Sequence, residues 1–357
     1  MVRRILLINI VITALIGLGG SAWPDDQLPE DGRPNRELQT LGGLQFWTDE
    51  RICGPYRIQR HVSMGYYRLL DGFEIRRAWG SYETCDAALE ECYPPESRMH
   101  SSKRVVLLLH GLGRGRHSMN ALADRLRQEG SDEVIQFGYA STQEGIGSHA
   151  RSLDCVVRRL DGVHEVDIVA YSLGCLVARY WLGDLVAETP HTVTAPRPKM
   201  RRCVMLGPPN QGAERANVWA RSPMGQKLFD LILGESGRQI GPQFREIQGH
   251  LATPACEFGI IAGGRGTLEG WNIEIPGDDD GTVGVRETML AGARDFAVTP
   301  VRHINLISDD RTLHMTTMFL RHGYFDSAAN RVSIPRPARG DPADRSQACE
   351  SRLTHCH

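Results

Sequence analysis

One serine stands where a strand pattern changes directly into a helix pattern. Apolar residues run from Val166 to Ala170, helical spacing begins at Leu173, and Ser172 lies between them. A serine in such a turn presents its hydroxyl over the end of a sheet, beside the first amides of the helix. The chain passes close to itself there, and Ala170 and Gly174 supply the small residues that the motif G-x-S-x-G requires. Ser172 is therefore predicted to be a nucleophile, although a serine at this place can also act as a simple helix N-cap.

A glycine-containing loop, His110-Gly111-Leu112-Gly113-Arg114, directly follows an earlier apolar strand. Attack on an acyl group creates an oxyanion that backbone amides must stabilise, and loss of one such donor costs roughly 10²–10³ in rate. We expect the amides of Leu112 and Leu173 to be these donors. Glycine loops also bind phosphate, but this one lacks the Lys-Ser/Thr ending of a P-loop, and no acidic partner for a ribose is evident.

Three consecutive aspartates, Asp278 to Asp280, lie in the long loop after the predicted strand 258–262. A base histidine must be held in one tautomer by a carboxylate, and a loop beyond a strand end can supply it. Asp280 is the favoured residue because glycine and then apolar chain follow it, with Asp279 and Asp278 as alternatives. Such a run is also typical of a solvated turn or a calcium loop, but the ligand spacing of an EF-hand is missing.

Two histidines compete for the role of proton carrier near the end of the chain. His303 follows the last predicted strand, 296–301, whereas His314 falls inside a predicted helix over 311–321. A side chain that shuttles a proton should reach the active edge of the sheet from a loop. His303 is therefore predicted to be the base, and an ordinary surface histidine is the alternative.

The elements that must position these residues alternate between apolar strands and helical segments after Lys103. Strands are predicted over 105–109, 134–139, 166–170, 203–206, 258–262 and 296–301, and helices over 118–128, 148–160 and 173–182. Strands that are apolar throughout are buried on both faces, as in a parallel sheet covered by helices on both sides. The sequence therefore predicts an α/β fold with a mostly parallel sheet.

The composition changes near Ser101 and divides the chain. We expect an extension over 23–100 that contains strands at 56–62, 66–70 and 74–79 and a helix at 81–91, which together form a small β-sheet and helix module. Its function is not legible from the sequence, and a packing or docking appendage is the favoured interpretation. The α/β domain is expected over 101–330, and an irregular, proline-containing tail over 331–357.

Residues 1–22 have the order of an export signal: two arginines, an apolar run and then small residues ending at Ala22. The run is short for a membrane span of about 20 residues. The protein is therefore expected to be exported, to the periplasm or the medium, or to stay attached to the membrane by this segment if the segment is not removed.

Charge and cysteine content exclude several classes of partner. The 41 Lys and Arg residues nearly balance 43 Asp and Glu residues, so nothing favours nucleic acid as a partner. Nine cysteines leave at least one thiol that is free or bonded between chains, and their connectivity is not given by the sequence. No pair has the C-x-x-C spacing typical of zinc ligands, so no metal site is expected.

The chain order Ser172, Asp280, His303, with an early His-Gly loop, resembles the α/β-hydrolase family. It looks more specifically like bacterial esterases and lipases of the triacylglycerol-lipase type. The resemblance runs from about 105 to 325 and includes the segments 206–212 and 319–323. Ala170 departs from the first glycine of the family motif, as in related small lipases.

The resemblance implies an exported serine hydrolase that cleaves a carboxylic ester through an acyl-enzyme. Ser172 would be the nucleophile, His303 the base and Asp280 the acid, with Leu112 and Leu173 as oxyanion donors. Neither a metal nor an organic cofactor is required.

The sequence says little about the size of the substrate. An insertion over 212–250 lies where a lid or acyl-binding cap would sit. It carries an apolar stripe of Trp219, Met224, Leu228, Phe229, Leu231, Ile232 and Leu233. Such a stripe is often simple core packing, but it motivates a small-molecule or lipid ester substrate, with a long-chain ester and transient contact with a lipid interface as further expectations. A protein partner is not identified by the sequence.

Two alternatives stay open. The same three residues also permit cleavage or transfer of another acyl group, such as an amide, a thioester or the acyl chain of a glycolipid. A different class is a non-catalytic binding protein with a hydrolase fold, in which the module over 56–91 is the contact surface. A protein without catalytic activity is disfavoured, because all three proposed triad positions carry the residue types that catalysis requires.

Overall fold

Six parallel strands form the central sheet of the protein. A computed structural model describes residues 38–39, 45–97, 103–131, 133–186, 197–216 and 233–336. The strand order is β11-β10-β9-β8-β6-β7, and every neighbouring pair is parallel. The strands are β6 (Arg104–Leu109), β7 (Val134–Phe137), β8 (Glu165–Tyr171), β9 (Lys199–Leu206), β10 (Glu257–Gly263) and β11 (Asp295–Thr299). The predicted parallel α/β sheet is confirmed.

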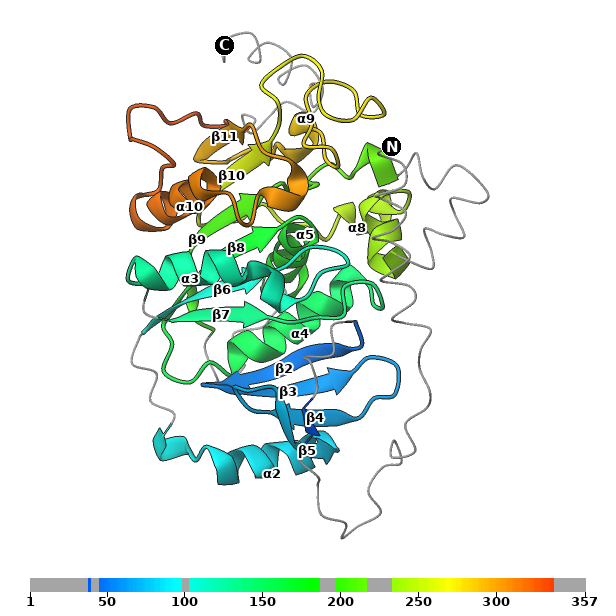
Figure 1. Cartoon of the computed structure of the whole chain (residues 1–357), viewed down its shortest axis with the longest axis vertical. Coiled ribbons are helices and arrows are strands. Elements are labelled where there is room, and N and C mark those ends of the chain that lie inside the picture. Colours follow the sequence, from blue (N-terminus) through cyan, green and yellow to red (C-terminus); the bar gives the residue numbers. More distant parts are fainter. Residues whose placement is uncertain are drawn as a thin grey trace.

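Helices cover both faces of this sheet (Figure 1). Successive side chains of a strand point to opposite faces, and β6 shows the consequence. Val105, Leu107 and Leu109 belong to one buried cluster with α4 (Ile146–Arg158) and α5 (Leu173–Tyr180). Val106 and Leu108 belong to a second cluster with α3 (Asn120–Gln128) and α10 (Asp310–His322). The uninterrupted apolar pattern of the strand therefore reflects two cores, one on each face.

Short helical segments complete this part of the chain. They are η2 (Arg116–Met119), a π-helical turn η3 (Trp181–Val186), α8 (Phe244–Gln248), α9 (Val285–Thr288) and η4 (His303–Asn305). Residues 233–240 are also helical and lie just before α8.

A separate antiparallel sheet precedes the central one, in the order β1-β5-β4-β3-β2. Its elements are β1 (Leu38–Gln39), β2 (Trp47–Cys53), β3 (Tyr56–His61), β4 (Tyr67–Leu70) and β5 (Ile75–Gly80), followed by α2 (Tyr82–Cys92) and η1 (Pro95–Ser97). Helix α2 packs on one face and forms a small core with β3 and β4. We call β1 to β5 with α2 the small sheet.

The sequence predicts three strands of the small sheet and misses β1 and β2. The centre of β2 reads Thr48-Asp49-Glu50-Arg51, which has no apolar alternation. Thr48 and Asp49 are nevertheless fully buried, because their polar atoms are bonded within the protein. In Figure 1 this strand is the edge of the small sheet that lies beside α4, on the side of the central sheet.

Several sequence predictions fall outside the described residues. These are the export signal over 1–22, the tail beyond residue 336 and most of the apolar stripe of the insertion, over 217–232. Among the residues that are described, no helix is long and apolar enough to cross a membrane. Free thiols are carried by Cys85, Cys92, Cys155, Cys175, Cys203 and Cys256.

Candidate active site

Ser172 has a strained backbone at the junction of β8 and α5. Its φ of 53° and ψ of −118° lie in a region that residues other than glycine rarely adopt. Among the non-glycine residues that the structure describes, only Ser172 and Glu74 have a positive φ. The amide of Ser172 donates to the Leu206 carbonyl at 2.9 Å, which fixes the turn against β9. Strain of this kind is maintained at functional turns that expose a nucleophile.

Two glycines permit the close passage of chain around this turn. A Cβ on Gly174 would lie 2.6 Å from the Leu109 carbonyl oxygen, at the end of β6. A Cβ on Gly111 would lie 2.8 Å from the Tyr171 ring and 3.3 Å from the Ser172 Cβ. The glycine loop after β6 therefore reaches the serine because neither position carries a side chain.

Ser172, His303 and Asp280 meet at the carboxyl ends of the strands. Nε2 of His303 lies 3.0 Å from the Ser172 Oγ, and Nδ1 lies 2.6 Å from the Asp280 Oδ2. A carboxylate only accepts, so Nδ1 carries the proton and Nε2 is left to accept from the serine hydroxyl. All three residues are buried, with 9% of Ser172, 6% of His303 and 1% of Asp280 exposed. The serine oxygen therefore faces a base in the tautomer that can take its proton.

The structure distinguishes the three neighbouring aspartates. Asp280 alone contacts the histidine, and its other oxygen accepts the amides of Thr282 and Val283 at 2.9 and 2.8 Å. The carboxylates of Asp278 and Asp279 accept only backbone amides of their own loop. His314 is exposed on α10 and is not part of this group.

One expected oxyanion donor directly follows the serine in the chain, and the other lies in the glycine loop. Leu173 is the first residue of α5, where a helix leaves its amides without partners, and Leu112 lies in the glycine loop. Within the described chain, neither amide donates to a protein acceptor. The next amide of the loop, that of Gly113, donates to the Ser141 Oγ at 3.0 Å. Both Leu112 and Leu173 amides are thus available to a ligand oxygen.

Some supporting residues escaped the sequence analysis. The hydroxyl of Tyr171 donates to the His303 carbonyl at 3.0 Å, and the His303 amide donates to the Asp280 carbonyl at 2.9 Å. Burial raises the pKa of the Tyr171 hydroxyl, which therefore stays a donor. Tyr171 stands next to the serine in the motif, which is a usable signal, whereas nothing local marks Ser141.

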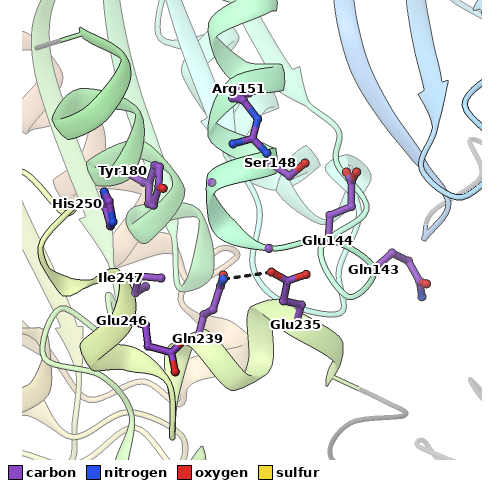
Figure 2. Close-up of a pocket in the computed structure, with 12 residues that line it drawn as sticks. Gln143, Glu144, Ser148, Arg151, Tyr180, Glu235, Gln239, Glu246, Ile247 and His250 are labelled. Carbon is purple, nitrogen blue, oxygen red and sulfur yellow. Dashed lines mark hydrogen bonds between the residues drawn. The ribbon is translucent and has the colours of Figure 1, made fainter. Parts of the chain in front are cut away.

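Figure 2 shows the residues that line a polar cavity of about 490 Å³. Ser172, His303 and Asp280 are not among them. Side chains of α4, α8 and the helical residues 233–240 line the cavity, and Glu144, Arg151, Glu235 and Glu246 give it a charged wall. Such a lining does not suit an acyl chain. The cavity therefore gives no support to a lipid-binding role for the described part of the insertion.

Two buried histidines flank the Tyr139 ring: His110, the first residue of the glycine loop, and His149 of α4. Burial lowers the pKa of His110 to about 4 and that of His149 to about 3. Ser236 donates to the Glu144 carbonyl, so His149 donates from Nε2 to the Ser236 Oγ at 3.2 Å. Its Nδ1 has no hydrogen-bond partner among the described residues.

We expect acid to destabilise the protein through these two histidines. An unfolded histidine titrates near 6.5, so stability is fully present above that pH and is lost as pH falls toward 4 and 3. Each contributes on the order of 3 kcal/mol. In urea unfolding between pH 7.5 and 4.5, His149→Phe should flatten the fall in unfolding free energy. The exposed-residue variant His314→Ala should keep the wild-type slope, and an unchanged slope in His149→Phe would contradict the assignment.

No group of three or more histidine, cysteine, aspartate or glutamate side chains within the described ranges has the arrangement of a metal site.

Comparison with known proteins gives a limited set of matches. A family model described as a domain of unknown function, DUF7379, matches residues 74–233, less than half of the chain. No curated protein matches. Among solved structures, the mature lipase BlEst2 of Bacillus licheniformis is 18% identical over 60% of this chain and 90% of its own, with a TM-score of 0.45.

Two further solved structures have a similarly low identity and TM-score. The product of gene lin2722 from Listeria innocua is 20% identical, over 63% of this chain and 97% of its own, with a TM-score of 0.43. A metagenomic carboxyl esterase, MGS0156, is 13% identical, over 58% of this chain and 66% of its own, with a TM-score of 0.41. The chain's own parallel strand order, with a serine in the strained turn after β8, is the architecture of the α/β-hydrolase fold.

Proposed function

We propose that the protein is a serine hydrolase that cleaves carboxylic esters through an acyl-enzyme. The observation that carries this proposal is the hydrogen-bonded line from the Ser172 Oγ through the His303 ring to the Asp280 carboxylate, with distances of 3.0 and 2.6 Å. A serine that served only as a helix cap would need neither a strained backbone nor an aligned imidazole. Its side chain in fact makes no capping hydrogen bond.

In the proposed reaction, His303 Nε2 takes the hydroxyl proton as the Ser172 Oγ attacks the acyl carbon. The amides of Leu112 and Leu173 stabilise the resulting oxyanion. The imidazolium then protonates the leaving alcohol, and Asp280 holds the ring and stabilises its positive charge. Water hydrolyses the acyl-enzyme by the same route, which regenerates the serine.

The substrate is proposed to be a small-molecule or lipid ester. We further propose that the protein acts outside the cytoplasm, on the strength of the N-terminal sequence pattern over 1–22. The filled and aligned triad argues against a non-catalytic binding protein. Amide, thioester and glycolipid substrates remain alternatives within the same chemistry.

Covalent labelling tests the proposal directly. A fluorophosphonate probe should label the wild-type protein once, at Ser172, because only an activated serine attacks such phosphorus centres readily. Ser172→Ala should show no label by intact-mass measurement, while Ser148→Ala, at the rim of the polar cavity, should label like wild type. Equal labelling of the wild type and Ser172→Ala would overturn the assignment.

A further inference from the structure

The small sheet bonds to the chain segment that follows β7. The Asp49 amide donates to the Gly138 carbonyl at 2.8 Å, and the Gly138 amide donates back to the Asp49 Oδ2 at 2.7 Å. Two residues further on, the Ala140 amide donates to the Thr48 Oγ1 at 3.1 Å. Strand β2 thus binds backbone atoms at two points of this segment, which we call the β7 loop (residues 138–141).

The β7 loop in turn holds the glycine loop of the candidate active site. The Ser141 Oγ accepts the Gly113 amide at 3.0 Å. The Tyr139 ring stacks on the His110 ring with centroids 4.0 Å apart, and its hydroxyl donates to the His110 carbonyl. A neutral His110 accepts the Tyr139 amide at Nε2 and donates from Nδ1 to the Gly111 carbonyl at 2.9 Å. Leu112, the expected oxyanion donor, lies between the residues held in this way.

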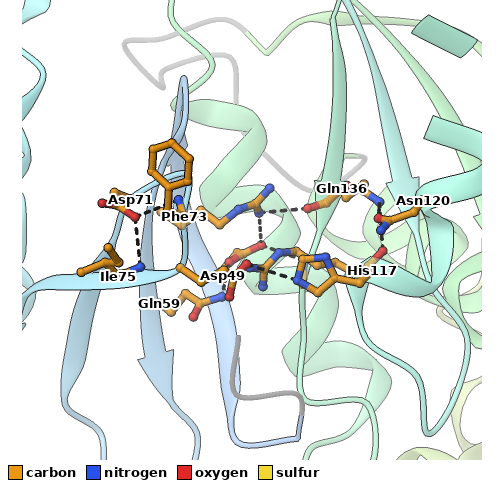
Figure 3. Close-up of polar contacts among 12 residues, drawn as sticks. Asp49, Gln59, Asp71, Phe73, Ile75, His117, Asn120 and Gln136 are labelled. Carbon is orange, nitrogen blue, oxygen red and sulfur yellow. Dashed lines mark hydrogen bonds and ion pairs between the residues drawn. The ribbon is translucent and has the colours of Figure 1, made fainter. Parts of the chain in front are cut away.

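The buried Asp49 charge is balanced inside the small sheet. Arg57 donates to its Oδ2 at 2.7 Å and Gln59 to its Oδ1 at 2.7 Å. Arg57 also donates to the Gln136 carbonyl of β7 at 2.9 Å. Figure 3 shows Asp49 and Gln59 facing Gln136 and His117 across the boundary between the small sheet and the central sheet. A fully satisfied network of this kind holds its members in one geometry.

A second contact holds the other end of the glycine loop. Glu74, in the turn between β4 and β5, forms an ion pair with the buried Arg116, two residues after that loop. Glu74 adopts a positive φ of 62°. Asp71 supports this turn by accepting the amides of Phe73 and Ile75 at 2.8 and 3.0 Å (Figure 3). The second non-glycine residue of the described chain with a positive φ thus lies in the small sheet, at an ion pair with a residue close to the glycine loop.

We propose that the small sheet positions the oxyanion loop, with Thr48, Asp49 and Glu74 as positioning residues. The proposal rests on the proposed function, because it assigns the Leu112 amide to oxyanion stabilisation. Apolar contacts, such as that of Ile52 of β2 with the central core, hold two parts together but are not directional. Here Thr48 and Asp49 bind the backbone of the β7 loop, which bonds in turn to the glycine loop. Glu74 binds the Arg116 side chain on the other side, and directional contacts of this kind fix where the amides of the loop point.

The decisive variant is Thr48→Val, which keeps the shape of a β-branched residue but removes the acceptor for the Ala140 amide. We expect kcat for p-nitrophenyl butyrate to fall about tenfold with KM changed less than twofold, because a displaced donor weakens binding of the transition state more than of the ester. Affinity for a trifluoromethyl ketone inhibitor, whose bound form carries an oxyanion, should fall by a similar factor. Thr48→Ser should restore both.

A matched control separates positioning from stability. Leu69→Val removes one methylene from the core of the small sheet and touches no residue of the β7 loop. It should lower the melting temperature at least as much as Thr48→Val does, yet leave kcat and inhibitor affinity at the wild-type level. If Leu69→Val lowers kcat equally, or if Thr48→Val leaves kcat and inhibitor affinity unchanged, the positioning role is wrong.

Hydrogen exchange makes the test independent of the reaction. In Thr48→Val, the hydrogen-bonded amides of Gly113 and Arg114 should exchange faster than in the wild type, whereas Leu69→Val should leave them protected. Absence of ester hydrolysis in the wild type would refute the proposed function alone. Unchanged exchange in Thr48→Val would refute the positioning role, whatever the activity.

Discussion

Replacing Ser172 or His303 by alanine should each lower kcat for ester hydrolysis by about 10⁶, and the double variant should lose no more than either single one. Ser172 without the base keeps its proton, and the base without Ser172 has nothing to activate. The 3.0 Å contact between the Ser172 Oγ and the His303 Nε2 makes them one functional unit. Effects of residues that act as one unit are not additive, so the loss of kcat in the double variant should be far smaller than the product of the two single losses.

The measurement is steady-state hydrolysis of p-nitrophenyl butyrate by the three variants, corrected for the uncatalysed rate. His314→Ala is the control, because this second histidine is exposed on α10 and should leave kcat at the wild-type level. A double variant whose loss equals the product of the two single losses would mean that the residues act independently, which would contradict the proposed mechanism.

Asp280→Asn should lower kcat by about 10⁴ through the tautomer of His303. The Asp280 Oδ1 already accepts two backbone amides, so the amide oxygen of an asparagine would take that place. The NH₂ group would then face the His303 Nδ1, which lies 2.6 Å from the carboxylate in the wild type. That nitrogen would have to accept, the proton would move to Nε2, and Nε2 could no longer accept from Ser172.

Asp278→Asn is the matched control, two residues away in the same loop. The Asp278 carboxylate accepts backbone amides only, from Arg265 and Gly266 at 2.7 and 2.9 Å. We expect kcat to stay within about threefold of wild type, because surface substitutions away from the reacting groups have small effects. Comparable losses in Asp278→Asn and Asp280→Asn would show that the loop, rather than one carboxylate, matters to the reaction.

The small sheet and the candidate site are linked by specific contacts rather than by proximity in sequence. Thr48 and Asp49 are more than 60 residues before the glycine loop in the sequence. The β7 loop nevertheless bonds both to these two residues and to the glycine loop. Two non-glycine residues of the described chain have a positive φ: Ser172, the candidate nucleophile, and Glu74, which pairs with Arg116 near the glycine loop. A strained conformation persists only where the surrounding structure holds it in place.

Local patterns in the sequence determined much of the architecture. Strands such as β6 and β8 bury both faces, so their composition marks them without reference to the rest of the chain. The turn at Ser172 is likewise local, because the small residues on both sides and the change of periodicity stand within a few positions of one another. The fold class and Ser172 as the candidate nucleophile could therefore be read from the sequence alone.

Only the tertiary structure decided the features that depend on partners distant in the sequence. Asp278, Asp279 and Asp280 are equivalent as a pattern, and only the position of the His303 ring separates them. Strand β2 reads as polar chain, because its buried side chains are polar and find their hydrogen-bond partners in residues up to 92 positions away. A buried polar group and a solvated one look the same in sequence, and the free energy that distinguishes them comes from partners that only the folded chain brings together.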